Sequence, residues 1–147
     1  MKPCPRINIS FLSTSFPRFE GDFSGNFVLC YAQELNNLGV DIEIIVPDDP
    51  KSLPLSENFS LIRFPYFFPR SWQTLAYGSG IINKPSMFVW LQLPFLLINF
   101  FLAALRSTRK TQLLHAFWSA SGIIARQCVV LIPSRCSSLY GVLINLL

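Results

Sequence analysis

The residues best suited to bind an anion lie in a glycine-containing loop that precedes a predicted helix. This loop carries Gly21 and Gly25, follows the polar cluster 13–15, and leads into helical spacing of apolar residues from about Ser24. The first turn of a helix has backbone N–H groups without intrahelical partners and the positive end of the helix dipole. The loop therefore predicts a place where phosphate or another anion binds.

A second group of candidate residues lies in the segment 66–85, which mixes aromatic residues with Arg70 and shows no sustained period. Its aromatic side chains can stack on ring-shaped ligands, and Arg70 can meet an anion above a binding cleft. An ordinary surface connection with partly buried aromatic residues explains the same composition. Both interpretations stay open at this point.

The elements that position these residues alternate between strand and helix. Strands are predicted from short apolar runs at 7–12, 40–47, 59–65 and 112–118, with a weaker fifth at 134–140. Helices are predicted over 24–38, where Gly39 ends the pattern, and over 123–129. The first helix is expected to turn one apolar face to the sheet, formed by Phe27, Tyr31, Leu35 and Leu38 and widened by Val28 and Ala32. The alternation predicts an α/β fold with a Rossmann-like, doubly wound, mostly parallel sheet.

Ligands of such sheets bind beyond the carboxyl ends of the strands. The segments expected there are 13–25, 66–72, 115–122 and 140–142. His115 would stand near the end of the fourth strand, and Trp118 would follow it. This rim is the candidate site.

The run 87–105 contains nineteen residues without a charge and is followed by Arg106, Arg109 and Lys110. Its length approaches that of a membrane span. Gln92, Asn99 and Arg106 recur every seven residues as one narrow polar stripe, and Pro94 interrupts the helical pattern. A spanning helix, a helix lying on a membrane surface and a long core helix of a soluble domain remain three open alternatives.

The 147 residues suit one domain, and their charge is unevenly distributed. All eight Asp and Glu lie in the first 57 residues, whereas the remaining ninety hold eight Lys or Arg and no carboxylate. This basic part favours an anionic partner such as a phosphate-rich substrate or an anionic membrane surface, and without a recognition motif it does not favour nucleic acid. Four scattered cysteines without metal-ligand spacing predict reduced structural thiols in a cytosolic protein, and the N-terminus does not have the pattern of a signal peptide.

Several segments together resemble the N-terminal domain of family 4 glycosyltransferases, which are retaining enzymes of the GT-B fold. The matching segments, in order, are FLSTSFPRFEGDFSGNFVLCYAQELNNLGVDIEIIVPDDP, RFPYFFPRSWQTLAYGSGI, WLQLPFLLINFFLAAL, LLHAFW followed by SGIIA, and IP followed by LYG. The resemblance implies that 1–147 form the acceptor-side lobe of a GT-B fold that is incomplete at its C-terminus. It further implies a sugar or lipid-linked acceptor, a nucleotide-sugar donor held by a second lobe that is expected to be missing, and no metal or other cofactor.

The resemblance also implies roles for single residues. Gly25 matches the glycine loop of the family, where the backbone approaches a phosphate or sugar. His115 matches the first histidine of an H-x-H pattern and would bind an acceptor hydroxyl, Trp118 would stack on a sugar, and Arg70 would contact an anion. A helix-start glycine, a strand-end histidine, a buried aromatic residue and a solvated arginine are the corresponding structural interpretations. No catalytic residue is predicted.

The chain departs from the family pattern at three positions. LYGVLIN lies where the family commonly has a sequence like LHGSDVN, so Tyr140 and Leu143 replace a histidine and an aspartate, and Phe117 replaces the second histidine of H-x-H. A phenol and an alkyl group are poor substitutes for groups that stabilise developing charge. The isolated chain is therefore expected to be inactive. Its expected location is the cytoplasm, peripheral at the inner face of the membrane. The alternatives are a non-catalytic binding module at a membrane or partner lobe, and a small membrane protein built around 87–105.

Overall fold

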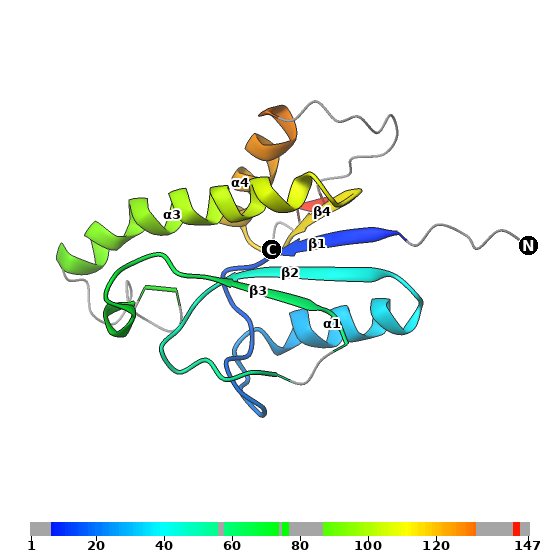
Figure 1. Ribbon diagram of the computed structural model, residues 1–147, viewed down its shortest axis with the longest axis horizontal. Coiled ribbons are helices and arrows are strands. Elements are labelled where there is room, and N and C mark those ends of the chain that lie inside the picture. The colour runs from blue at the N-terminus through cyan, green and yellow to red at the C-terminus, as the bar shows by residue number, and fades with distance from the viewer. Residues whose placement is uncertain (1–6, 56–57, 74, 77–86, 132–142, 145–147) are drawn as a thin grey trace, which may run out of the picture.

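The computed structural model describes residues 7–55, 58–73, 75–76, 87–131 and 143–144. The strands are β1 (Asn8–Leu12), β2 (Asp41–Pro47), β3 (Ser60–Phe64), β4 (Leu113–Ala116) and β5 (Leu143–Ile144). The helices are α1 (Asn26–Asn37), the short 3₁₀ helix η1 (Arg70–Trp72), α3 (Met87–Thr108) and α4 (Ser119–Leu131). Figure 1 shows their arrangement around a single sheet.

The described strands form one sheet in the order β3-β2-β1-β4-β5, and every neighbouring pair is parallel. Helix α1 covers one face, while α3 and α4 cover the other (Figure 1). Helices on both faces are the arrangement that a parallel sheet requires, because its crossover connections must pass above or below it. The predicted α/β fold with a doubly wound parallel sheet is confirmed.

Side chains of β1 alternate between the two faces, as the strand period of two requires. Phe11 belongs to the apolar cluster under α1, whereas Leu12 belongs to the cluster under α3 and α4. Helix α1 approaches this sheet through Val28 and Ala32, which are fully buried. The expected inward face is therefore wrong for three of its four main residues, since Phe27, Tyr31 and Leu38 are exposed. Small side chains let α1 lie close to the strands, and the large rings are displaced to its flank.

Helix α3 is longer than expected and continues through Pro94. Proline lies on its exposed side, so the ring does not disturb the contact with the sheet. The predicted polar stripe does not share one environment. Gln92 is buried and donates through Nε2 to the carbonyl of Trp72 at 2.9 Å, whereas Arg106 is exposed.

Two further expectations differ from the structure in their limits. β4 ends before Phe117, and α4 extends beyond 123–129 at both ends. The strand predicted at 134–140 lies outside the described residues, as do Cys4 and Cys136.

Cys30 and Cys128 are free thiols, and burial raises the pKa of Cys128 to about 11, in keeping with the expectation of a structural thiol at this position.

Candidate functional site

Gly25 stands at the junction between the loop after β1 and helix α1. Its φ of +69° is left-handed, and a Cβ placed there would lie 2.5 Å from the carbonyl oxygen of Ser15 and 2.8 Å from the amide nitrogen of Phe16. Only glycine allows this approach of the two loop segments. No side chain caps the first turn of α1, and the backbone amides of Asn26 and Val28 donate to the carbonyls of Phe23 and Gly25 at 3.3 and 3.0 Å. This helix N-terminus lies at the carboxyl-end edge of the sheet (Figure 1).

Serine hydroxyls fasten the loop at this junction. Ser13 Oγ donates to the carbonyl of Ser15 at 2.7 Å and accepts from the amide of Ser15 at 3.2 Å. The hydroxyls of Ser15 and Ser24 lie 3.1 Å apart. These bonds hold the end of β1 and the start of α1 in one fixed geometry, with polar groups around the helix N-terminus.

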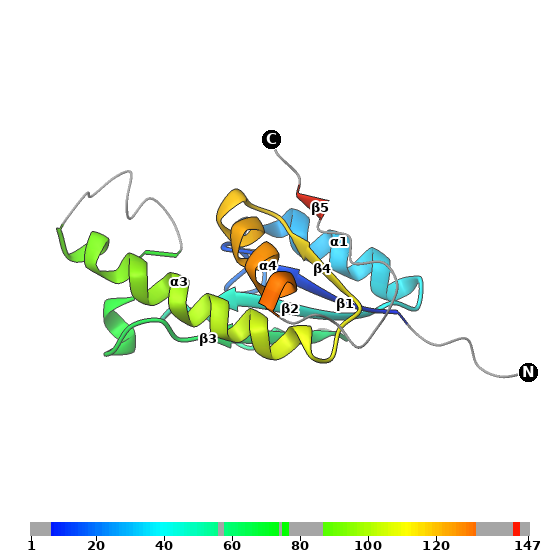
Figure 2. The same cartoon turned by 90° about the horizontal axis from the view of Figure 1, so that it is seen from above.

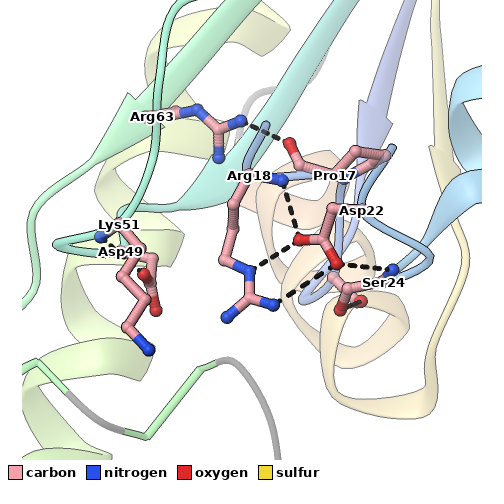
Figure 3. A network of polar contacts seen from close by, with 8 residues as sticks. Pro17, Arg18, Asp22, Ser24, Asp49, Lys51 and Arg63 are labelled. Atoms are coloured by element: carbon pink, nitrogen blue, oxygen red, sulfur yellow. Dashed lines mark hydrogen bonds and ion pairs between the residues drawn. The ribbon is translucent and has the colours of Figure 1, made fainter. Parts of the chain in front are cut away.

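An internal ion pair shapes the middle of the same loop. Arg18 donates through Nε to Asp22 Oδ2 at 2.6 Å, and the same carboxylate accepts the backbone amides of Arg18 and Ser24, both at 3.1 Å (Figure 3). The hydrogen bonds from Arg18 outweigh the effect of burial and lower the pKa of Asp22 to about 2. Arg63 of β3 anchors the loop from the side, with a 2.6 Å bond to the carbonyl of Pro17.

Arg70 lies at the end of β2 and β3, in η1. Its guanidinium forms a two-point pair with the carboxylate of Asp48, at 2.6 Å from Nε and 2.9 Å from Nη2, and also reaches the carbonyl of Asp49 at 3.2 Å. Hydrogen bonding to Asp48 raises the pKa of Arg70 above its ordinary value. The guanidinium is thus already partnered by a carboxylate. Its role as an anion contact stays a prediction, and its visible role is to tie the segment after β3 to the end of β2.

His115 lies on β4, opposite Phe11 of β1 in the parallel register. Its imidazole stacks on Phe117 with ring centroids 4.5 Å apart and meets Phe11 and Tyr31 edge-on at 5.4 and 5.6 Å. The residue is 6% exposed, and its Nε2 is buried without a hydrogen-bond partner among the described residues. Burial lowers the pKa of His115, so the neutral ring is favoured.

Aromatic rings that are exposed or half-buried lie near this histidine on the flank of α1. We call Phe27, Tyr31, Phe117 and Trp118 the aromatic patch. Phe27 meets Phe117 at 5.7 Å and Trp118 at 6.2 Å, both edge-on, and Phe27 and Trp118 are 52% and 45% exposed. Ser121 fixes the position of Trp118, since its hydroxyl accepts from the backbone amide of Trp118 at 3.1 Å and donates to its carbonyl at 2.8 Å.

The predicted site residues fall into two groups. Gly25, His115 and Trp118 gather around the N-terminal half of α1, because Phe27 follows Gly25 by two residues and touches the ring of Trp118. Arg70 belongs to a separate group with Asp48, and β1 and β2 separate β4 from β3 in the sheet. The predicted rim segment 140–142 lies outside the described residues.

Sequence reasoning missed two features of this edge. Asp48 and Asp49 are both buried. Arg70 pairs with Asp48, and Asp49 accepts a hydrogen bond from the Lys51 amide at 2.8 Å, which closes a turn. Two carboxylates directly after a buried strand are the signal that could have identified them. Phe27 and Tyr31 were expected to face the sheet. The sequence signal against this was that the helix has more large apolar side chains than one face can bury.

The described part of the chain contains no group of three or more His, Cys, Asp or Glu residues arranged to hold a metal ion. What the edge offers instead is aromatic surface, serine hydroxyls and an uncapped helix N-terminus. No known family model matches the sequence, and no curated protein is detectably similar to it.

Proposed function

We propose that this chain is the acceptor-side lobe of a GT-B glycosyltransferase of the family 4 type, and that the aromatic patch and the adjoining start of α1 bind a saccharide acceptor. In the intact enzyme, the sugar of a nucleotide sugar held by a second lobe would pass to an acceptor hydroxyl with retention at the anomeric carbon. The sequence resemblance motivates the enzyme class. The observation that carries the binding site is the juxtaposition of exposed Phe27 and Trp118 with the Gly25 junction.

This juxtaposition suits a sugar ring for chemical reasons. The C–H face of a pyranose is apolar and packs on an aromatic ring, while its hydroxyl rim needs donors and acceptors at the edge of that ring. Phe27 and Trp118 supply the apolar surface, and the serine hydroxyls of the loop and the N-terminus of α1 lie beside it. A negatively charged acceptor would gain further from the helix dipole.

Titration of the full chain with a panel of saccharides tests this proposal, with the heat of binding in isothermal titration calorimetry as the readout. We expect saturable changes with one class of saccharide and a loss of roughly tenfold or more in affinity in Trp118→Leu, since stacking on an aromatic ring contributes on the order of 1 kcal/mol or more. Trp72→Leu is the matched control, because Trp72 is similarly exposed but belongs to the Arg70 group. Absence of saturable binding, or equal affinity in both variants, would refute the site.

A non-catalytic binding module is the second candidate, and the polar side chains of the edge favour it. Asp22 and Arg70 are both engaged in internal ion pairs, and His115 is buried among rings. These groups support the fold of the edge, whereas an acid, base or charge stabiliser must reach a substrate. Incubation of the chain with a separately expressed GT-B donor-binding lobe, labelled nucleotide sugars and the saccharide it binds separates the candidates. Labelled product indicates an enzyme, and retained binding without product indicates the module.

A further inference from the structure

Helix α3 leaves a continuous apolar face uncovered. The buried side of the helix packs on the sheet through residues such as Leu96, Phe100 and Ala104. The opposite side exposes large apolar side chains along the whole helix, namely Met87, Phe88, Trp90, Leu91, Phe95, Leu97, Ile98 and Leu102. Its 22 residues give a length of about 33 Å at 1.5 Å per residue. Contiguous exposed apolar surface of this size marks an interaction face.

The segment after β3 extends this face at one end. Phe68 is 90% exposed and Trp72 is half exposed. The N-terminal half of α3 reaches past the ends of the strands (Figures 1 and 2). Ring contacts fasten the segment to the helix: Phe67 meets Phe88 and Phe95 at 5.5 and 5.7 Å, and Trp72 meets Phe88 at 5.5 Å. An apolar groove of about 500 Å³ opens there, lined by Pro65, Tyr66, Phe67, Phe68 and Phe95.

The exposed charge at the C-terminal end of α3 has one sign. Arg106, Arg109 and Lys110 are exposed at the C-terminal end of α3, and the helix itself carries no carboxylate. No Asp or Glu occurs anywhere after Glu57 in the sequence. An anionic surface would therefore meet cations without any opposing acid on this helix.

We propose that α3 and residues 66–72 form a surface that lies on an anionic lipid bilayer, with the exposed apolar side chains in the headgroup and acyl boundary and the three cations at the phosphates. Trp90 and Trp72 are side chains of the type that membrane interfaces favour. This inference does not depend on saccharide binding, so either proposal can fail while the other stands.

Two other occupants agree less well with these observations. About a third of the 18-residue stretch of α3 with the highest mean hydropathy is buried against the rest of the fold. If α3 crossed a bilayer, these residues would leave the sheet and the apolar cluster around Phe100 would be exposed. A second copy of the chain would bring the same cations and no carboxylate on α3 to pair with them. A bilayer of anionic lipids supplies both the apolar medium and the opposite charge.

Flotation of the full chain, produced by cell-free synthesis in the presence of vesicles, tests the proposal. We expect the wild type to float with vesicles containing 30% phosphatidylglycerol and to float less with pure phosphatidylcholine or at high salt. Leu91→Gln/Ile98→Gln should lower partition roughly tenfold or more. Leu38→Gln/Leu53→Gln is the matched control, since both leucines are exposed and lie away from α3, and it should float like the wild type.

Two further measurements test the role of the cations and whether the chain lies on the bilayer or crosses it. Arg106→Gln/Arg109→Gln should lower partition to anionic vesicles about fivefold per residue and reduce the dependence on salt. Extraction at alkaline pH should release the chain, because a surface-bound domain leaves the bilayer. The proposal is overturned if the wild type does not float, if the control loses as much as the α3 variant, or if alkali leaves the chain in the membrane. A dimer that only Leu91→Gln/Ile98→Gln dissociates, without vesicle binding, would overturn it in favour of a second copy.

Discussion

Helices α1 and α3 cover opposite faces of the same sheet, and both expose apolar side chains, but they do so in different surroundings. The exposed rings of α1 are few and lie beside serine hydroxyls, a helix N-terminus without a side-chain cap and a buried histidine. The exposed side of α3 is a long apolar stripe with three cations at its C-terminal end. One surface alternates apolar and polar contacts at close range, whereas the other separates them.

This difference indicates what each surface can recognise. A sugar presents an apolar face and a polar rim within one small ring, which matches the spacing of groups around α1. A bilayer presents a thick apolar layer and a separate layer of charge, which matches α3. The amount of exposed apolar surface alone would not distinguish the two, and the position of the polar groups does.

The two sides of α3 should respond most differently to truncation. Phe100 is buried and stacks on Phe64 with centroids 5.0 Å apart, so Phe100→Ala should lower the free energy of unfolding by about 3–5 kcal/mol. Ile98→Ala, two residues earlier but exposed, should change it by less than about 1 kcal/mol. Urea unfolding followed by circular dichroism measures both. Equal losses would mean that the exposed side of α3 is covered within the fold.

The Gly25 junction should be the most sensitive position on the α1 side. Gly25→Ala adds a Cβ that must displace the Ser15 carbonyl and also strains a left-handed backbone, and it should cost about 3 kcal/mol. Gly21→Ala is the control, because Gly21 is also left-handed but has open space around its Cβ, and it should cost about 1 kcal/mol. The difference in unfolding free energy between the two variants isolates the close approach. If they lose the same amount, the contact with Ser15 does not constrain the loop.

A polar cluster at the other end of the sheet should contribute less. Ser107 of α3 bonds the carboxylate of Glu43 on β2, and its hydroxyl lies 2.6 Å from that of Ser10 on β1. Ser107→Ala removes one partner from this partly buried group and should cost about 1–2 kcal/mol in unfolding free energy. Thr108→Ala serves as the control, since its hydroxyl bonds only the helix carbonyl of Leu105 among the contacts described. A larger loss in the control would show that the cluster does not hold α3 to the sheet.

Much of the architecture could be predicted because it depends on local periodicity. The runs around Ile9, Ile44 and Leu114 have the composition of buried strands, and the turn at Gly39 ends the first helix as expected. The inward side of α1 could not be predicted in the same way. Phe27 and Val28 are both apolar, and only the distance between helix and sheet decides that the smaller side chain is buried.

The candidate site was harder to predict because its geometry depends on pairs that are distant in sequence. Arg70 reads as a cation available to a ligand until Asp48, 22 residues earlier, is found against it. The Gly25 junction differs, since glycine before a helix and after a strand has a local meaning that the structure retains. The exposed side of α3 also required the structure, because composition alone is equally compatible with a core helix and a membrane helix.

The smallest effect concerns the protonation of His115 under α1. Its ring neighbours Phe11, Tyr31 and Phe117 include no carboxylate or amine that would stabilise an imidazolium. Since burial lowers the pKa of His115 in the folded state, the unfolded chain binds a proton first as the pH falls. The stabilisation is complete above the unfolded pKa of about 6.5 and decreases below it toward the lower folded pKa. We therefore expect the urea midpoint to fall between pH 7.5 and 5.5, and His115→Phe to flatten this dependence while keeping the ring stack. If the urea midpoint of His115→Phe depends on pH as strongly as that of the wild type, another group takes up the proton. His115 would then not be buried in the way described, and its ring would be accessible to a ligand bound beside α1.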